Sequence, residues 1–188
     1  MCSSDLVADL LRTDRDLIAR KVRRWVCMAF DYPKGKEYNA KHDAAASAYA
    51  LANWPAEIPI TFVDFPIGRH CYAGRAVAEL PDTANPVRDA FRAKMMPRHE
   101  VVRHESWDQA AGHPSWDEIA ALVAVRGAAP YFDLQRGMHH MVGTEGENVW
   151  TDDPRSPNGR VTFRMSAEEV GRVLDELMCR EPKNKWRK

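Results

Sequence analysis

Glu37 and Asn39 are the residues of this sequence whose types and spacing point most directly to ligand binding. They lie two positions apart in a loop-like stretch, so both side chains could project toward one ligand. A carboxylate accepts hydrogen bonds from sugar hydroxyls, and an amide both donates and accepts them. The competing interpretation is an ordinary turn in which Asn39 bonds the backbone. The pair is therefore a candidate for binding a hydroxyl-rich ligand.

Asp117 is a further candidate, because it follows Trp116 at the start of an apolar stretch with helical character. A carboxylate buried at that position would be costly unless it were paired with a cation or with hydrogen-bond donors. In the competing interpretation it is a first-turn aspartate that interacts favourably with the helix dipole. Trp116 could stack on a ligand's base or pack in the core, as large aromatic residues usually do.

The other conspicuous polar residues are expected to be structural. His113 is interpreted as a loop histidine, and His139 with His140 as a solvated loop pair, because no third ligand stands at a metal-site spacing. Asp43 precedes an alanine-rich stretch and is predicted to cap a helix rather than to bind a ligand.

The elements that must position the candidates follow from hydrophobic periodicity. Residues 6–24 show the apolar spacing of a helix, and residues 25–30 and 58–63 are short apolar runs typical of buried parallel strands. An alanine-rich helix over residues 44–51 lies between these two runs. Strand, helix and strand in this order predict an α/β fold with the two strands parallel and close together.

The second half of the chain is predicted to be mainly helical. Three helices are expected, over residues 86–96, 115–126 and 166–179. Ser115 and Glu118 have the spacing of a capping box at the start of the second one. Residues 149–150 and 160–163 could pair as a small antiparallel hairpin. We therefore expect a mainly parallel sheet with flanking helices and this hairpin near the C-terminus.

Length and composition limit the classes of protein. A chain of 188 residues is long enough for one domain, predicted over residues 1–182, and 27 basic residues balance 27 acidic ones. Nucleic acid and membranes are thus not expected as partners. The basic segment 183–188 is predicted to be a solvated tail rather than a nucleic-acid site. The four cysteines suggest neither a zinc site nor disulfides, which favours a reduced, cytoplasmic setting.

Four segments, in the correct order along residues 22–181, resemble one enzyme family. They are Pro33-Lys34-Gly35-Lys36-Glu37-Tyr38-Asn39 with Asp43-Ala44-Ala45-Ala46, Asn53-Trp54-Pro55 with Phe65-Pro66-Ile67-Gly68, Asn85-Pro86-Val87-Arg88-Asp89-Ala90, and His113-Pro114-Ser115-Trp116-Asp117 with Ala121-Leu122-Val123-Ala124-Val125-Arg126-Gly127. Together they resemble the C-terminal part of the inosine–uridine preferring nucleoside hydrolases, which are calcium-dependent N-glycosidases of purine and pyrimidine salvage.

The resemblance implies a nucleoside hydrolase-like α/β fold and hydrolysis of the ribonucleoside N-glycosidic bond. It implies that Glu37 and Asn39 hold the ribose, that Asp117 is a calcium ligand and that Trp116 could contact the base. Members of the family often have histidine at the position of Trp116, where it activates the leaving base, and glutamate at the position of Pro66. With Trp116, protonation of the base by that residue is lost, and with Pro66 the usual contacts of that loop are not expected. A small-molecule nucleoside is the expected partner, and a homo-oligomer is left open.

The sequence departs from the family in one decisive respect. The family's acidic Asp-x-Asp-x-x-x-Asp-Asp motif supplies most of the calcium ligands and the general base, and no segment here matches it. Calcium requires six to eight oxygen ligands, which Asp117 with substrate and water cannot supply well. We therefore expect no catalytic residue in this chain, an N-terminally truncated domain and an incomplete calcium site. The alternative is a non-catalytic homologue that binds a nucleoside or ribose, or assembles with a partner.

Overall fold

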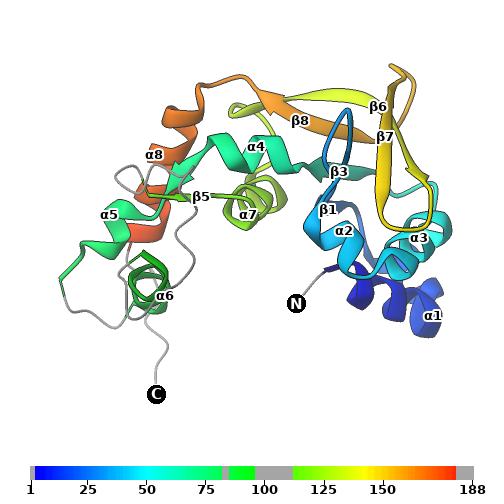
Figure 1. Cartoon of the computed structure of the whole chain (residues 1–188), viewed down its shortest axis with the longest axis horizontal. Helices are drawn as coiled ribbons and strands as arrows, with labels where there is room; N and C mark the ends of the chain where they lie inside the picture. Colours follow the sequence, from blue (N-terminus) through cyan, green and yellow to red (C-terminus); the bar gives the residue numbers. More distant parts are fainter. Residues whose placement is uncertain (1–2, 82–84, 96–111, 181–188) are drawn as a thin grey trace. The chain divides into compact units, whose positions relative to one another are not determined.

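The computed structural model describes residues 3–81, 85–95 and 112–180 (Figure 1). The chain divides into two compact units, Met1–Arg69 with Trp116–Arg164 and His70–Ser115 with Met165–Lys188, which are described separately below as unit 1 and unit 2. The single domain over residues 1–182 stays a prediction. The predicted basic tail, 183–188, lies outside the described residues.

Unit 1 is built on a six-stranded sheet with the order β1-β3-β8-β6-β7-β2. The strands are β1 (Trp25–Met28), β2 (Lys34–Lys36), β3 (Ile60–Val63), β6 (Phe132–Val142), β7 (Glu147–Asp152) and β8 (Gly159–Phe163). Strands β1, β3 and β8 are parallel to one another, while β6 pairs antiparallel with β8 and β7, and β7 with β2. The α/β fold class with flanking helices is confirmed, and its antiparallel part is larger than expected.

The two predicted parallel strands are confirmed as direct neighbours. Trp25 pairs with Ile60 and Met28 with Val63, so β1 and β3 are in register along their whole length. Both strands are shorter than the apolar runs that predicted them. Pro59 lies directly before β3, where its carbonyl accepts a hydrogen bond from the Trp25 N–H (3.0 Å). Proline has no backbone N–H to donate, and the start of a strand is a position that tolerates this.

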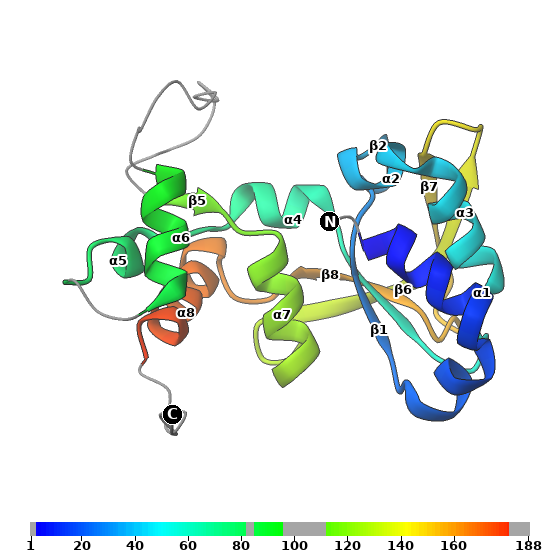
Figure 2. The ribbon, with the colours of Figure 1, turned by 90° about the horizontal axis from the view of Figure 1, so that it is seen from below.

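Helices cover both faces of the parallel strands (Figure 2). Helices α1 (Ser3–Lys21) and α3 (Ala44–Asn53) bury Ala8, Leu11, Ile18, Ala46 and Ala50 in a core with the side chains of alternate strand residues Cys27 and Phe62. Met28 and Val63 point to the opposite face, because side chains alternate along a strand. Helix α7 (Asp117–Arg126) packs against β1 and buries its apolar residues Ile119, Leu122 and Val123.

The predicted hairpin between residues 149–150 and 160–163 is wrong in its pairing. Strands β7 and β8 contain these residues, but both pair with β6, which lies between them. Strand β6 has 11 residues, enough for its first half to pair with β8 and its second half with β7. The antiparallel hairpin of the structure is therefore β6 with β7.

Unit 2 contains a two-stranded sheet and helices. Its elements are β4 (Tyr72–Ala73), α5 (Arg75–Ala78), α6 (Pro86–Met95), β5 (His113–Pro114) and α8 (Ala167–Cys179). The capping box of α8 is present: the Ser166 hydroxyl accepts from the Glu169 N–H, and the Glu169 carboxylate accepts from the Ser166 N–H. Gly171 lets α8 approach β4 closely, because a Cβ there would lie 2.2 Å from the carbonyl oxygen of Tyr72. Among the described helices, none has the length and apolar character needed for a membrane span.

The capping box predicted for Ser115 and Glu118 is wrong. Helix α7 begins after Trp116, which provides no side-chain cap. Ser115 is one residue too early to cap this helix, and its hydroxyl donates instead to the carbonyl of His113 (3.2 Å). The start of α7 is therefore held by other contacts, described below.

Candidate functional site

The carboxyl ends of β1 and β3 meet at one edge of unit 1. Phe30 follows β1 with a φ of 77°, a backbone conformation that bulky residues rarely adopt. Two hydrogen bonds hold it: its N–H donates to Glu37 Oε2 (3.4 Å), and its carbonyl accepts from the Phe65 N–H (2.8 Å). Such strained backbone often lies at functional sites, and the carboxyl ends of parallel strands are the usual place for ligands in α/β proteins.

Glu37 caps α2 (Tyr38–His42) and is almost completely buried, with 5% of its surface exposed. Besides Phe30, the N–H groups of Asn39 (2.8 Å) and Ala40 (3.1 Å) donate to the same oxygen, Oε2. Burial raises the pKa of Glu37. The hydrogen bonds from these N–H groups oppose this effect, because they favour the charged carboxylate and lower the pKa. The turn is thus organised by Glu37 rather than by Asn39. Contact of Glu37 with a ribose stays a prediction.

Asn39 lies on the side of the sheet that α7 covers. Its Nδ2 donates to Met28 Sδ (3.3 Å), and Met28 points to that face. The half-buried amide stands directly at the end of β1. A ligand at this strand end would therefore meet Asn39 from the side of α7.

The N-terminus of α7 contacts Phe65, the second residue after the end of β3. Trp116 donates from Nε1 to the carbonyl of Phe65 (2.9 Å), and the two rings stack with centroids 5.5 Å apart. The next residue, Asp117, is exposed at the first position of the helix. The indole is half-buried and donates its N–H in this contact. A contact of its remaining exposed surface with a base stays a prediction.

The predicted site residues lie at the same end of the parallel strands. At the other end of α7, Arg24, just before β1, donates to the carbonyl of Ala124 (2.7 Å), so α7 runs antiparallel to β1. A chain of hydrogen bonds then leads from Glu37 through Phe30 and Phe65 to Trp116, beside Asp117. Convergence of the Glu37, Asn39 and Asp117 side chains on one cleft stays a prediction.

Two carboxylates at these strand ends were missed in the sequence. Asp31 follows β1, and its backbone forms two hydrogen bonds with the buried Asn148 (3.2 and 2.9 Å). Asp64 follows β3 with 2% of its surface exposed, and burial raises its pKa to about 6. Burial also raises the pKa of Asp31, which the nearby Arg69 opposes. Their positions directly after predicted parallel strands were a usable signal.

The interpretation of His139 and His140 as a solvated loop pair is wrong. Both residues lie in β6, and His139 points inward, where its Nδ1 is 2.7 Å from the hydroxyl of Tyr32 and its ring lies 4.1 Å from that of Phe30. Burial lowers the pKa of His139 to about 3, so the ring is neutral at pH 7. The strand position of these two histidines was not predicted, because alternation along β6 places one side chain inside and the other in solvent.

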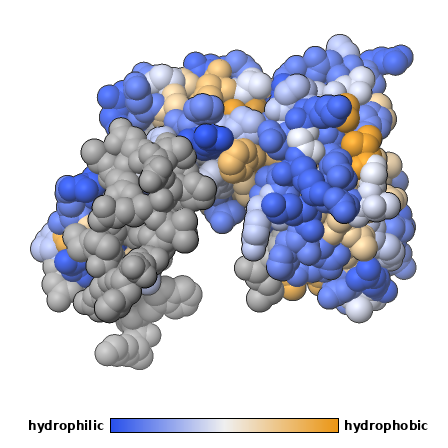
Figure 3. Space-filling model, viewed as in Figure 1, coloured by the Kyte–Doolittle hydropathy of each residue, from blue (hydrophilic) through white to orange (hydrophobic). Residues whose placement is uncertain are grey.

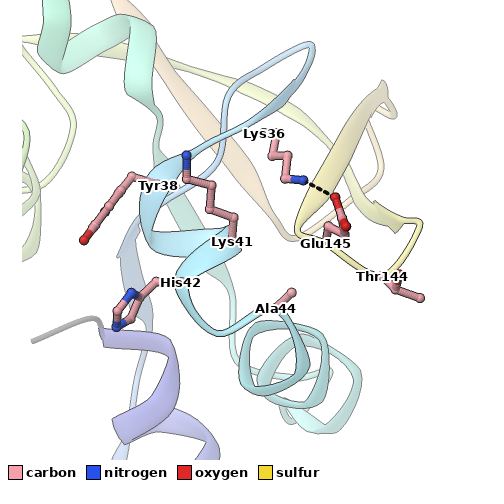
Figure 4. Close-up of a pocket in the computed structure, with 7 residues that line it drawn as sticks. All are labelled: Lys36, Tyr38, Lys41, His42, Ala44, Thr144 and Glu145. Atoms are coloured by element: carbon pink, nitrogen blue, oxygen red, sulfur yellow. Dashed lines mark hydrogen bonds and ion pairs between the residues drawn. The ribbon is translucent and has the colours of Figure 1, made fainter.

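An open depression lies on the outer side of α2 (Figure 4). The side chains that line it are Lys36, Tyr38, Lys41, His42, Ala44, Thr144 and Glu145. Lys36 is paired with Glu145 (2.6 Å), Tyr38 is 65% exposed, and the surface over α2 is hydrophilic (Figure 3). Glu37 and Asn39 are not among the lining residues, so the depression is separate from the strand-end site.

The described residues do not fit a complete calcium site. No group of three or more His, Cys, Asp or Glu among residues 3–81, 85–95 and 112–180 is arranged to hold a metal ion. Asp117, the predicted calcium ligand, would contribute one carboxylate to the six to eight oxygens that calcium requires. Asp43 is confirmed as a helix cap, since its carboxylate accepts from the Ala46 N–H (2.8 Å).

Comparison with known proteins finds similarity among solved structures alone. No family model matches the chain. No curated protein matches it either. The chain is similar in fold to the inosine–uridine preferring nucleoside hydrolase from Bacillus anthracis, with 16% sequence identity and a TM-score of 0.49. The similarity covers 93% of this chain and 56% of the hydrolase, so this chain spans little more than half of that protein's length.

Proposed function

We propose that this chain is the ribose-binding portion of a ribonucleoside N-glycosidase and hydrolyses no nucleoside by itself. The four ordered motifs of the sequence support the assignment to this class of enzyme. The absence of the acidic motif from the sequence supports the lack of activity, because that motif provides the family's general base.

One structural observation carries the proposal. The hydrogen-bonded path from Glu37 through Phe30 and Phe65 to Trp116 connects the two predicted halves of the site, and its ends, Glu37 and Trp116, are 79 residues apart in sequence. It supports a single surface at the strand ends, with Asn39 on one side and Asp117 on the other. A ribose presents several hydroxyls to such a surface, and carboxylate and amide groups are suitable partners for them.

The proposed roles follow from the contacts of each residue. Asn39 binds a ribose hydroxyl with its amide, and Glu37 accepts from a second hydroxyl while its Oε2 holds the loop. Asp117 approaches the sugar from the start of α7. Calcium is proposed for the complete enzyme only, and none of these roles in the present chain depends on it.

Calorimetric titration with D-ribose and with inosine tests the proposal. We expect saturable binding by the wild-type chain and about tenfold weaker binding by Asn39→Ala, equivalent to about 1.4 kcal/mol. Asn53→Ala is the matched control, because the Asn53 amide bonds the Tyr49 carbonyl within α3 (2.9 Å). Equal affinities of the two variants, or no binding by the wild-type protein, would contradict the proposal. Calcium-dependent stabilisation would indicate a metal site more complete than the one described.

A further inference from the structure

Asp64 is a buried carboxylate with two structural partners. Its Oδ1 accepts from the N–H of Ile67 (3.2 Å), three residues later, as a cap of α4 (Phe65–His70) does. Its Oδ2 lies 3.5 Å from Arg160 Nη1 on the neighbouring strand β8. One side chain therefore connects the end of β3, the start of α4 and β8.

Arg160 is itself fixed in place. Its Nε donates to Gln135 Oε1 on β6 (2.9 Å), and its guanidinium lies 5.8 Å from the ring centroid of Tyr32 and 6.0 Å from that of Trp150. Only 17% of its side chain is exposed. The positive charge facing Asp64 is thus held by neighbours on three other segments.

Phe65, the residue after Asp64, carries both backbone bonds that join the candidate site. Its N–H donates to the carbonyl of Phe30, whose N–H bonds Glu37, and its carbonyl accepts from Trp116, which precedes Asp117. A movement of Phe65 would therefore displace both sides of the site together. The position of Phe65 is set by the turn that Asp64 caps.

We propose that Asp64, paired with Arg160, is a positioning residue that fixes Phe65 and thereby holds the Glu37 loop and the Trp116 indole in register. The effect of Asp64 on ligand binding rests on the proposed ribose-binding function. The arrangement of Phe65 and Trp116 can be measured without a ligand.

The charge of Asp64 provides a specific readout. Burial raises the pKa of Asp64 to about 6, while the Ile67 N–H and Arg160 lower it and the nearby Asp31 raises it. Tyr32 also faces this group, and its pKa is raised well above the usual value by burial first and by Asp64 among other charges. Protonation of Asp64 near pH 6 weakens its pairing with Arg160, so the contact between Phe65 and Trp116 should change over the same pH range.

The test uses full-length protein with 15N-labelled tryptophan, whose indole N–H resonances are followed from pH 7.5 to 5. Trp116→Phe removes one resonance and so assigns the Trp116 indole. We expect this resonance to shift with a midpoint near pH 6 in the wild-type protein and to lose that shift in Asp64→Asn, which retains an acceptor for Ile67. Asp43→Asn is the matched control, because Asp43 caps a different helix and should leave the titration unchanged.

Arg160→Gln is a second variant, and it should move the midpoint to higher pH because Arg160 lowers the pKa of Asp64. A Trp116 resonance that does not titrate in the wild-type protein, or that titrates equally in Asp64→Asn, would overturn the positioning role. The affinity for D-ribose should fall several-fold over the same pH range in the wild-type protein and in Asp43→Asn, but not in Asp64→Asn. Absence of ribose binding at every pH would instead reject the proposed function, while the indole titration would still decide the role of Asp64.

Discussion

The Glu37 carboxylate has a measurable structural task, independent of any ligand. It accepts hydrogen bonds from three backbone N–H groups, of Phe30, Asn39 and Ala40, at a nearly inaccessible position. Leaving buried donors without an acceptor costs about 1–3 kcal/mol each, reduced where water can enter. We expect Glu37→Ala to lower the free energy of unfolding by about 2–4 kcal/mol, measured by urea denaturation.

Asp43→Ala is the comparison for this prediction, because Asp43 satisfies one backbone donor of α3 in a half-buried setting. It should cost about 1 kcal/mol, the usual effect of removing a helix cap. Glu37→Gln should fall between the two. A loss for Glu37→Ala no larger than that for Asp43→Ala would show that the three donors find other partners.

His139 and Asp64 give the folded protein opposite responses to acid. Burial lowers the pKa of His139 from 6.5 to about 3, so the unfolded chain takes up this proton first and stability falls as the pH drops below 6.5. Burial raises the pKa of Asp64 from 3.8 to about 6, so the folded protein takes up that proton first and stability rises as the pH drops below 6. Between about pH 6 and 4 the two slopes, each about 1.4 kcal/mol per pH unit, oppose one another.

Variants should separate the two responses. Relative to its own value at pH 7, the stability of His139→Gln should rise when the pH is lowered to 5, and that of Asp64→Asn should fall. The wild-type protein should change less than either. Urea midpoints measured at several pH values test this expectation, and three parallel pH profiles would show that neither group has the shifted pKa.

At the scale of elements, the close packing of α4 against the start of α7 depends on a glycine. A Cβ at Gly68 would lie 2.1 Å from Cδ1 of Trp116. Alanine ordinarily stabilises a helix relative to glycine by about 1 kcal/mol. Here we expect Gly68→Ala to destabilise the protein by about 1–3 kcal/mol, because the indole has to move.

The double variant Gly68→Ala with Trp116→Ala isolates this clash. Removing the indole should make the alanine at 68 neutral or favourable, which gives a coupling energy between the two sites. Thermal or urea denaturation of the four proteins completes the cycle. Additive effects of the two substitutions would contradict the predicted contact.

The elements that the sequence predicted well are those whose residues satisfy local rules. Strands β1 and β3 are apolar on both faces, and Asp43 and Ser166 have capping side chains at the required spacing. Strand β6 could not be recognised in this way. It has polar residues such as Gln135 and His139 on its inward face, where Gln135 Oε1 accepts from Arg160 and His139 Nδ1 pairs with the hydroxyl of Tyr32, both from distant parts of the chain.

Contacts between distant parts of the chain also limited the prediction of the candidate site. The sequence predicted Glu37, Asn39 and Asp117, but it did not distinguish a side chain that holds the loop from one that meets a ligand. Glu37 holds the loop through backbone donors, which have no signature in the residue type, and its contact with a ribose stays a proposal. The burial and pairing of Asp64 could not be predicted, because its partner Arg160 is 96 residues away.

At the scale of the whole molecule, the purified chain should release no appreciable ribose from inosine or uridine, even with millimolar calcium. Loss of a general base typically costs about 10²–10⁴-fold in rate, and under the proposed function Trp116 stands where such enzymes often have the histidine that assists the leaving base. A reducing-sugar assay checks this. Calcium-dependent release of ribose that Asp117→Ala abolishes would contradict the expectation.

The place of β1 in the sheet affects the solubility of the chain. Among the described residues the sheet ends at β1, although its composition, Trp-Val-Cys-Met, is that of an interior strand. The Trp25 N–H donates toward β3, so the N–H of Val26 points outward and can template an incoming strand. We expect concentration-dependent aggregation in sedimentation velocity, reduced by Val26→Pro, which removes that outward donor and spares the pairing with β3. If Val26→Pro sedimented like the wild-type protein, self-association through the outer edge of β1 would be excluded.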